Sequence, residues 1–288
     1  MTTESDTQAF TSGFSTDDAA QLYFEVAGSG VPVVLLHAGV ADSRQWNNEF
    51  AWLSMHHRVV RYDLRGFGKS EPAEGEFSHR QGLQRVLATA GITEPAWMIG
   101  CSMGGTLAMD YALEYPERVR GLVLVGSGPS GLKLGAPRPE LFKAIERASE
   151  AGDLDLVAEL ETQIWFDGVG RKADQVDPVM RALACAMNRL ALQHEARSLG
   201  TRVADVTTSA AQRLHQVQMP VLSIVGEHDI PYIHLASDHL VQHVASARKR
   251  VLQDAAHLPN MDQPAAFRLL LEEFTGEADH GILPTEPS

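Results

Sequence analysis

The sequence has few of the features that would tie it to a disulfide scaffold, a nucleic acid or a membrane. Its 288 residues contain only 2 cysteines, Cys101 and Cys185, too few for a disulfide framework. Acidic residues outnumber basic ones, 37 to 24, and the formal charge of −13 leaves no basic face for nucleic acids or anionic lipids. The longest apolar runs fall well short of the roughly 20 residues that cross a bilayer.

The beginning of the sequence also lacks the pattern of a secretory signal. Residues 1–18, MTTESDTQAFTSGFSTDD, are acidic and polar, with no basic start followed by an apolar stretch. We therefore expect a cytoplasmic protein whose partner is a small molecule rather than a nucleic acid or a membrane. Homo-oligomer formation is compatible with this composition.

What the sequence does contain is an alternation of short apolar runs with helical patterns. This alternation predicts an α/β fold with a mostly parallel sheet that is covered by helices on both faces. Several of the runs are continuous in Val, Ile and Leu, which is typical of buried parallel strands. The strand candidates are residues 22–28, 32–39, 57–66, 95–100, 119–128, 219–229 and 247–255, and helices fit 79–91, 103–116, 230–244 and 264–274.

One interval, residues 129–216, interrupts the alternation. It has no convincing strand, only helical stretches, and it is too long for a crossover loop. We interpret it as a helical insertion between two strands of the sheet. The expected division is a core of residues 14–128 and 217–275, the insertion 129–216, and flexible tails at 1–13 and 276–288.

A serine stands where an apolar run turns into a helical pattern. Residues 100–104, GCSMG, match G-x-S-x-G, in which a tight strand-to-helix turn exposes the serine Oγ. Here the serine is Ser102, and the N–H of Met103 falls at a helix N-terminus, where negative charge is stabilised. Small residues at such a turn also serve plain packing, so a nucleophile needs a base and an orienting acid as well.

Both partners follow in the chain order typical of this motif. Asp229 ends the run VLSIVGEHD, and His257 lies in the loop after the next strand candidate. Each lies just beyond the C-terminal end of a strand, where open α/β sheets place their sites. Ser102, Asp229 and His257 are therefore the predicted catalytic residues.

Three other carboxylates compete with Asp229 for the role of the acid. Glu227 would serve only if its turn were one step tighter. Asp254 is better explained as an exposed loop carboxylate. Asp262 precedes Gln263-Pro264 and a helix, and is interpreted as an N-terminal cap.

Taken together, these motifs give the chain a resemblance to the alpha/beta-hydrolase fold superfamily, from about Leu22 to Phe274. In chain order they resemble the family's oxyanion loop, strand-four loop, nucleophile elbow, acid turn and histidine loop. The five segments are LLHAGVADSRQW, YDLRGFGKS, IGCSMGG, VGEHD and AAHLPNMDQP. The resemblance implies a mostly parallel eight-stranded sheet, and it makes the helical insertion a cap over the active site.

The resemblance also implies an oxyanion hole, and the sequence departs from the family pattern at two places. The donors would be the N–H of Met103 and that of either Gly39 or Val40, since His37-Ala38 stands where the family commonly has His-Gly. His37 would brace this loop rather than transfer protons. Cys101 replaces a frequent histidine and is interpreted as a small buried filler.

The other residues that could bind a metal, a phosphate or the substrate are better explained by packing or by exposure to solvent. His239 and His243 have an i, i+4 spacing that suits a metal, but no third ligand is apparent, so no metal is expected. The two glycines of DLRGFGKS match neither the dinucleotide fingerprint nor the phosphate loop, so no cofactor is expected. Trp165, Phe166 and Met187 of the insertion are substrate-pocket candidates, although an apolar stripe there is first of all cap packing.

The predicted function is hydrolysis of a carboxylic ester or lactone through an acyl-enzyme intermediate, and the resemblance leans towards enol-lactonase and carboxylesterase relatives. Epoxide hydrolases and haloalkane dehalogenases of this fold carry aspartate at the elbow, so Ser102 argues against them. The alternatives are a carbon–carbon bond hydrolase or metal-free perhydrolase with the same triad, and a ligand-binding receptor on a hydrolase scaffold.

Overall fold

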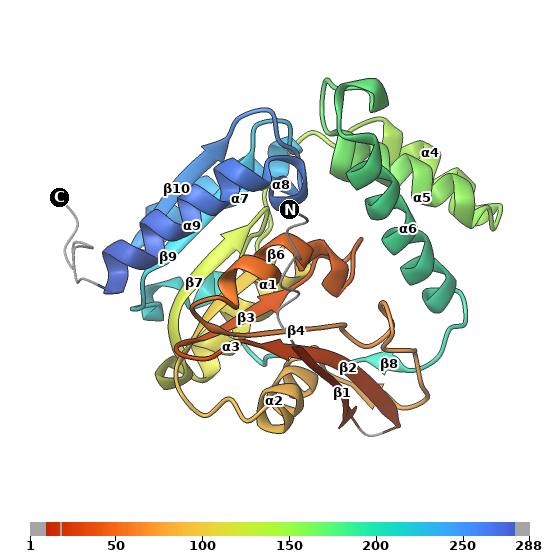
Figure 1. The fold of residues 1–288 in the computed structure, drawn as a ribbon. Coiled ribbons are helices and arrows are strands. Elements are labelled where there is room, and N and C mark those ends of the chain that lie inside the picture. The colour runs from red at the N-terminus through yellow and green to blue at the C-terminus, as the bar shows by residue number, and fades with distance from the viewer. Residues whose placement is uncertain (1–9, 18, 280–288) are drawn as a thin grey trace, which may run out of the picture.

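The computed structural model describes residues 10–17 and 19–279 and centres on one twisted sheet (Figure 1). Strands β1, β2 and β4 pair antiparallel, and all other neighbours in this sheet pair parallel. The mostly parallel eight-stranded sheet expected from the sequence is thereby confirmed. In spatial order its strands are β1 (Phe10–Asp17), β2 (Ala20–Ala27), β4 (Arg58–Tyr62), β3 (Pro32–Leu36), β6 (Ala96–Cys101), β7 (Val119–Val125), β9 (Val221–Gly226) and β10 (Ala247–Leu252).

Helices cover both faces of the sheet. Successive strand residues point to opposite faces, and the apolar side chains on each face are buried against these helices. Val34 and Met98 pack with α2, α3 and α7 on one face, whereas Val33 and Trp97 pack with α1 and α9 on the other. Both faces are therefore buried, which explains the continuous apolar runs. The helices of the core are α1 (Asn47–Leu53), α2 (His79–Thr89), α3 (Met103–Glu114), α7 (Pro231–His243), α8 (Pro259–Asp262) and α9 (Pro264–Asp279).

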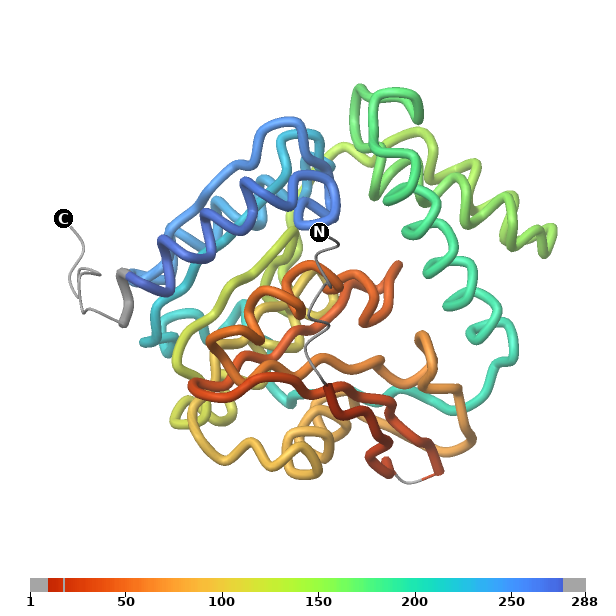
Figure 2. The backbone as a smooth tube through the Cα atoms, in the orientation of Figure 1, coloured from red at the N-terminus to blue at the C-terminus, as the bar shows by residue number. Residues whose placement is uncertain are grey.

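The segment between β7 and β9 forms a separate helical layer beside the sheet (Figures 1 and 2). Its helices are α4 (Leu141–Glu150), α5 (Leu154–Thr162) and α6 (Pro178–Glu195). We call this segment, residues 129–216, the cap. One detail differs from the sequence analysis, which found no strand here: β8 (Thr201–Arg202) pairs in parallel with β5 (Glu76–Phe77). Single turns lie at Ser43–Trp46, Pro116–Arg118, Gln163–Asp167, Ala173–Gln175, Ala210–Gln212 and Leu214–Gln216.

The ends of the folded region extend beyond the core boundaries expected from sequence. β1 begins at Phe10, inside the range 1–13 assigned to a tail, and α9 continues to Asp279. β1 is an edge strand of mostly exposed, small and polar residues, so it carries little of the apolar signal that marks a buried strand. The rest of the two tail assignments, residues 1–9 and 280–288, lies outside the described residues.

A substitution at Gly104 tests how closely the backbone of α3 approaches β3. A Cβ on Gly104 would lie 2.3 Å from the carbonyl oxygen of Leu36, which real contacts do not allow. We predict that Gly104→Ala lowers the free energy of unfolding by about 1–3 kcal/mol or more, because the backbone must move. Urea unfolding measures this, with Gly135→Ala as the control because a Cβ there meets nothing within 4 Å. Equal stability of the two variants would contradict the prediction.

Candidate active site

Ser102 lies at the turn between β6 and α3, in a backbone conformation that residues other than glycine rarely adopt. Its φ is 50° and its ψ is −113°, which costs about 1–3 kcal/mol and persists only where the surroundings enforce it. The Ser102 N–H donates to the carbonyl of Val125 at 2.8 Å. Within residues 10–17 and 19–279, every hydrogen bond of Ser102 uses its backbone, so no hydrogen bond joins its Oγ to His257.

His257 and Asp229 form a buried pair at the ends of two neighbouring strands. Asp229 follows β9, His257 follows β10, and their Nδ1 and Oδ2 atoms lie 2.8 Å apart. The other carboxylate oxygen of Asp229 accepts from the N–H of Ile230 at 2.8 Å. Because a carboxylate accepts hydrogen bonds, Nδ1 carries the proton and Nε2 is left as the basic nitrogen.

The His257 loop packs against the strand that ends at Ser102. The thiol of Cys101 donates to the carbonyl of His257 at 3.5 Å, and Cys101 is fully buried, as expected for a filler. A Cβ on Gly126 would lie 3.0 Å from Nδ1 of His257, and Gly126 follows Val125, the backbone partner of Ser102. The structure therefore brings Ser102, His257 and Asp229 to one edge of the sheet.

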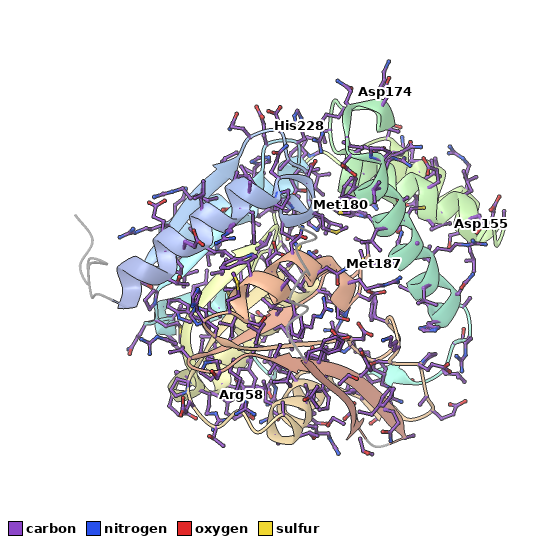
Figure 3. The ribbon with its side chains drawn as sticks, in the orientation of Figure 1. Arg58, Asp155, Asp174, Met180, Met187 and His228 are labelled. Atoms are coloured by element: carbon purple, nitrogen blue, oxygen red, sulfur yellow. The ribbon has the colours of Figure 1, made fainter. Side chains whose placement is uncertain are left out.

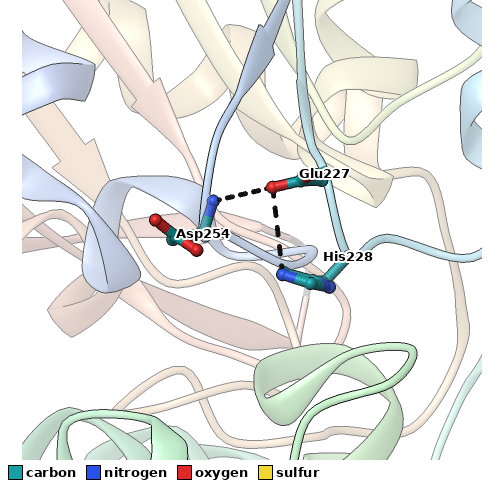
Figure 4. A group of neighbouring side chains, drawn as sticks. All are labelled: Glu227, His228 and Asp254. Carbon is teal, nitrogen blue, oxygen red and sulfur yellow. Dashed lines mark hydrogen bonds and ion pairs between the residues drawn. The ribbon is translucent and has the colours of Figure 1, made fainter.

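The competing carboxylates have other partners (Figure 4). Glu227 accepts from the N–H of the exposed Asp254 at 3.1 Å and lies 3.9 Å from Nε2 of His228. Donor atoms of these three side chains cluster within 4.8 Å, but Glu227 and Asp254 are exposed, as acidic groups often are without a metal. Neither of them contacts His257 in the way that Asp229 does.

Asp262 is not the helix cap that the sequence suggested. It is the last residue of α8, and its Oδ2 accepts from the N–H of Ala256 at 3.0 Å and from Arg171 Nη2 at 2.5 Å. Arg171 belongs to the cap and also donates to the carbonyl of Asp254. The carboxylate thus joins the cap to the His257 loop, a partner that adjacent sequence could not reveal.

The backbone donors predicted for the oxyanion belong to residues that line one cavity of about 570 Å³, whose lining does not include Ser102 or His257. Gly39, Val40 and Met103 line it, and in the described part of the chain none of their N–H groups donates a hydrogen bond. Gly39 lies beside the side chain of Met103: a Cβ added to Gly39 would be 3.8 Å from the Cβ of Met103. Free donors of this kind suit a developing negative charge, and Met103 adds the N-terminus of α3.

His37 braces the loop that carries two of these donors. Its Nε2 accepts from the N–H of Leu64 at 3.0 Å and its Nδ1 contacts the carbonyl of Ala38 at 2.8 Å. Nδ1 is therefore the protonated nitrogen and donates to Ala38. Burial lowers the pKa of His37, which favours the neutral ring that this bracing needs. The predicted structural role of His37 agrees with this geometry.

Three residues that the sequence analysis missed support the same loop. Gln45 Oε1 accepts from the N–H of Ala38 at 2.9 Å, while its Nε2 donates to Asn260 Oδ1 at 3.2 Å. Asn260 in turn donates to the carbonyl of Gln45 and to Glu49. This network, which we call the Gln45–Asn260–Glu49 network, links the predicted oxyanion loop to the segment after His257.

The three predicted pocket residues lie elsewhere than on the wall of the 570 Å³ cavity. The Trp165 ring packs against the His257 ring at a tilt of 45°, with centroids 4.5 Å apart, and the Trp165 carbonyl accepts from the His257 N–H at 3.2 Å. Phe166 and Met187 are buried in the cluster that joins the cap to the sheet, with Met187 on the inward side of α6 (Figure 3). These positions fit packing of the cap, and Trp165 covers the imidazole.

His239 and His243, for which no metal is expected because no third ligand is apparent in the sequence, lie on α7. Their rings stack with centroids 4.0 Å apart, and His243 Nδ1 contacts the carbonyl of His239. In the described residues no helix is both long and apolar enough to cross a membrane.

Comparison with known proteins assigns this architecture to a family. The model of the alpha/beta hydrolase fold matches residues 31–183, just over half of the 288 residues. The chain therefore belongs to the alpha/beta hydrolase fold family. The match covers the proposed oxyanion loop and the Ser102 turn.

Individual relatives support a hydrolase. The chain is 26% identical over 267 residues to a pimeloyl-[acyl-carrier protein] methyl ester esterase of Yersinia enterocolitica, covering 90% of this chain and 99% of that protein. It is 32% identical over 127 residues, 41% of this chain and 44% of the other, to a 2-hydroxy-6-oxo-6-phenylhexa-2,4-dienoate hydrolase of Comamonas testosteroni. The enol-lactonase structure from Burkholderia xenovorans LB400 shares the fold, with a TM-score of 0.74, 22% identity, and coverage of 92% and 100%.

The raised pKa of Glu49 predicts how the stability of the folded chain depends on pH. Burial raises its pKa from 4.5 to about 7, so between these values the folded chain binds more protons than the unfolded chain. Stability contributed by this carboxyl is present below pH 4.5 and is lost as pH rises to 7. We expect Glu49→Gln to gain stability relative to the wild type with rising pH, by up to about 1 kcal/mol per pH unit. Urea unfolding from pH 5 to 8 checks this, and parallel curves would refute it.

Proposed function

We propose that this chain is a serine hydrolase that cleaves a carboxylic ester or lactone through an acyl-enzyme intermediate. The observation that carries the proposal is the 2.8 Å contact between His257 and Asp229, at the sheet edge where Ser102 lies with a free Oγ. A hydroxyl is a weak nucleophile at neutral pH and needs such an oriented base.

Each group has a definite step in this mechanism. His257 Nε2 takes the proton of Ser102 as Oγ attacks the substrate carbonyl, and Asp229 stabilises the imidazolium that forms. The N–H of Met103 and that of Gly39 or Val40 hold the oxyanion, each such donor contributing about 2.7–4 kcal/mol in the transition state. His257 then protonates the leaving oxygen and activates the water that releases the acyl group.

Ester or lactone cleavage has the wider support among the relatives. The methyl ester esterase matches along 99% of its length, whereas the dienoate hydrolase matches along 44% of its own. That second relative supports hydrolysis of a carbon–carbon bond as the other candidate reaction. Both reactions use the same three side chains, and the substrate distinguishes them.

Ser102→Ala tests the nucleophile. We expect the wild type to release p-nitrophenol from p-nitrophenyl acetate with a burst that matches the enzyme concentration, and the variant to lose the burst. Steady-state activity of the variant should fall by about 10³-fold or more, because Oγ forms the acyl bond. An equal burst from both proteins contradicts the proposal. Ring-fission diketones, assayed in parallel, test the carbon–carbon reaction.

A matched pair of variants tests the acid. Asp229→Asn should lower kcat by up to about 10⁴-fold, because an amide favours the wrong tautomer of the imidazole. Glu227→Gln, two residues away on the same turn, should stay within a few-fold of the wild type, since Glu227 contacts Asp254 instead. If Glu227→Gln caused the larger loss of kcat, Glu227 rather than Asp229 would be the acid.

A further inference from the structure

One turn of the cap carries a side chain onto the proposed base. Trp165 lies in the turn Gln163–Asp167, and its ring packs against the imidazole of His257 with the centroids 4.5 Å apart. Its carbonyl accepts from the backbone N–H of His257 at 3.2 Å. Among the aromatic rings of residues 10–17 and 19–279, that of Trp165 alone contacts the imidazole. The ring and the backbone of His257 therefore both rest on one residue of the cap.

This contact encloses an imidazole that is almost sealed from solvent. The His257 side chain is 2% exposed, and that of its partner Asp229 is 0% exposed. On the side of the sheet, the thiol of Cys101 donates to the carbonyl of His257 at 3.5 Å. Burial raises the pKa of this thiol to about 12, so it adds no charge beside the imidazole at neutral pH. The indole of Trp165 closes the side that faces the cap.

The turn that carries Trp165 is wide and closely seated on the core. It closes with the N–H of Gly168 donating to the carbonyl of Gln163, five residues earlier, at 3.0 Å. Turns of this width are rare and frequently occur at functional sites. A Cβ on Gly168 would lie 2.6 Å from the Cβ of Ala256, the residue before His257. Glycine at this position therefore lets the cap approach the histidine loop.

Arg171 holds the same turn from within the cap. Its guanidinium donates to the carbonyls of Phe166 and Asp167, at 3.0 and 2.7 Å. Hydrogen bonds from a charged donor are stronger than those between neutral groups. Because both carbonyls directly follow Trp165 in the chain, the arginine fixes the end of its turn.

The guanidinium also reaches the histidine loop on either side of His257. It donates to the carbonyl of Asp254 at 2.7 Å and pairs with Asp262 at 2.5 Å. Asp262 in turn accepts from the N–H of Ala256 at 3.0 Å. The side chains of Arg171 and Asp262 are 8% and 5% exposed, so solvent screens this ion pair little. The cap turn and the histidine loop are thus fixed to each other.

We propose that Trp165 is a positioning residue for His257, and that Arg171 holds Trp165 in that position. This inference rests on the proposed function, in which His257 takes the proton of Ser102. The indole keeps the imidazole in one orientation and excludes water from it, and proton transfer to Nε2 requires such a fixed orientation. The cap therefore contributes to the rate of the reaction and does not only enclose the substrate.

Truncation of the indole tests the position of the base. Trp165→Ala should lower kcat for p-nitrophenyl acetate by about 10- to 100-fold and change KM by less than about threefold, because the imidazole loses its orientation. Trp165→Phe retains a ring and should recover most of kcat. Phe142→Ala is the matched control, since Phe142 packs edge-on against Trp165, whereas no ring contact joins it to His257 within the described residues. An unchanged kcat in Trp165→Ala, or an equal fall in Phe142→Ala, overturns the inference.

Two arginines separate positioning of the base from general weakening of the cap. Arg171→Gln should lower kcat by about tenfold, because it releases the turn from the histidine loop. Arg181→Gln removes an arginine that pairs with Glu159 and Asp167 inside the cap, and its kcat should stay within about threefold of the wild type. The double variant Trp165→Ala/Arg171→Gln should lose little more kcat than Trp165→Ala, since both substitutions disturb the same contact. Equal falls for the two arginine variants, or a double loss equal to the product of the single losses, overturn the inference.

Proton NMR tests the enclosure of the imidazole without relying on catalysis. In Ser102→Ala, the Nδ1–H that His257 donates to Asp229 should give a far-downfield resonance, because a buried N–H exchanges slowly with water. Loss of this resonance in His257→Gln assigns it. The resonance should persist when Phe142→Ala is added to Ser102→Ala and should disappear when Trp165→Ala is added.

The kinetic and NMR measurements distinguish this inference from the proposed function. If the wild type cleaves no ester, the proposed function fails, while a resonance that depends on Trp165 still supports its position over His257. If the wild type cleaves esters and the resonance survives in Ser102→Ala/Trp165→Ala, the proposed function stands and the inference is overturned. Absence of the resonance from Ser102→Ala overturns the inference as well, since the imidazole would then be open to water.

Discussion

The close approach of α3 to β3 is the constraint on which the candidate site depends. At Gly104 the helix backbone is so near the carbonyls of Leu36 and His37 that no side chain fits. This contact leaves the chain little room to turn, which places Ser102 in its strained conformation. The same contact brings Met103 against Gly39. One packing contact therefore fixes the turn that carries Ser102 and sets Met103 beside Gly39.

The loop that carries Gly39 needs support of its own, because a free N–H group is useful only if it is held in place. His37 and Gln45 supply that support, and Asn260 extends it to the segment after His257. The network includes Glu49, and burial of this carboxyl raises its pKa to about 7. These hydrogen bonds hold the proposed oxyanion loop and the segment after His257 in one fixed relation.

The cap is tied to the same histidine loop rather than resting on the sheet alone. Arg171 donates to Asp262 and to the carbonyl of Asp254, and the Trp165 carbonyl accepts from the N–H of His257. A displacement of the cap would therefore strain the position of the imidazole. Through these contacts the part of the chain that covers the cavity and the proposed base are mechanically coupled.

This coupling also explains which features could be predicted from the sequence. The turn at Ser102, the acid turn and the histidine loop depend on local backbone demands, so their residues are recognisable in short stretches. The partnership of Gln45 with Asn260 spans 215 residues, and nothing near either residue encodes it. Trp165 illustrates the limit most clearly, since the sequence marks it as an aromatic residue of the cap but not as the neighbour of His257. Which side chain covers an imidazole is a property of the folded surroundings, and it can be recognised only once every neighbour is in place.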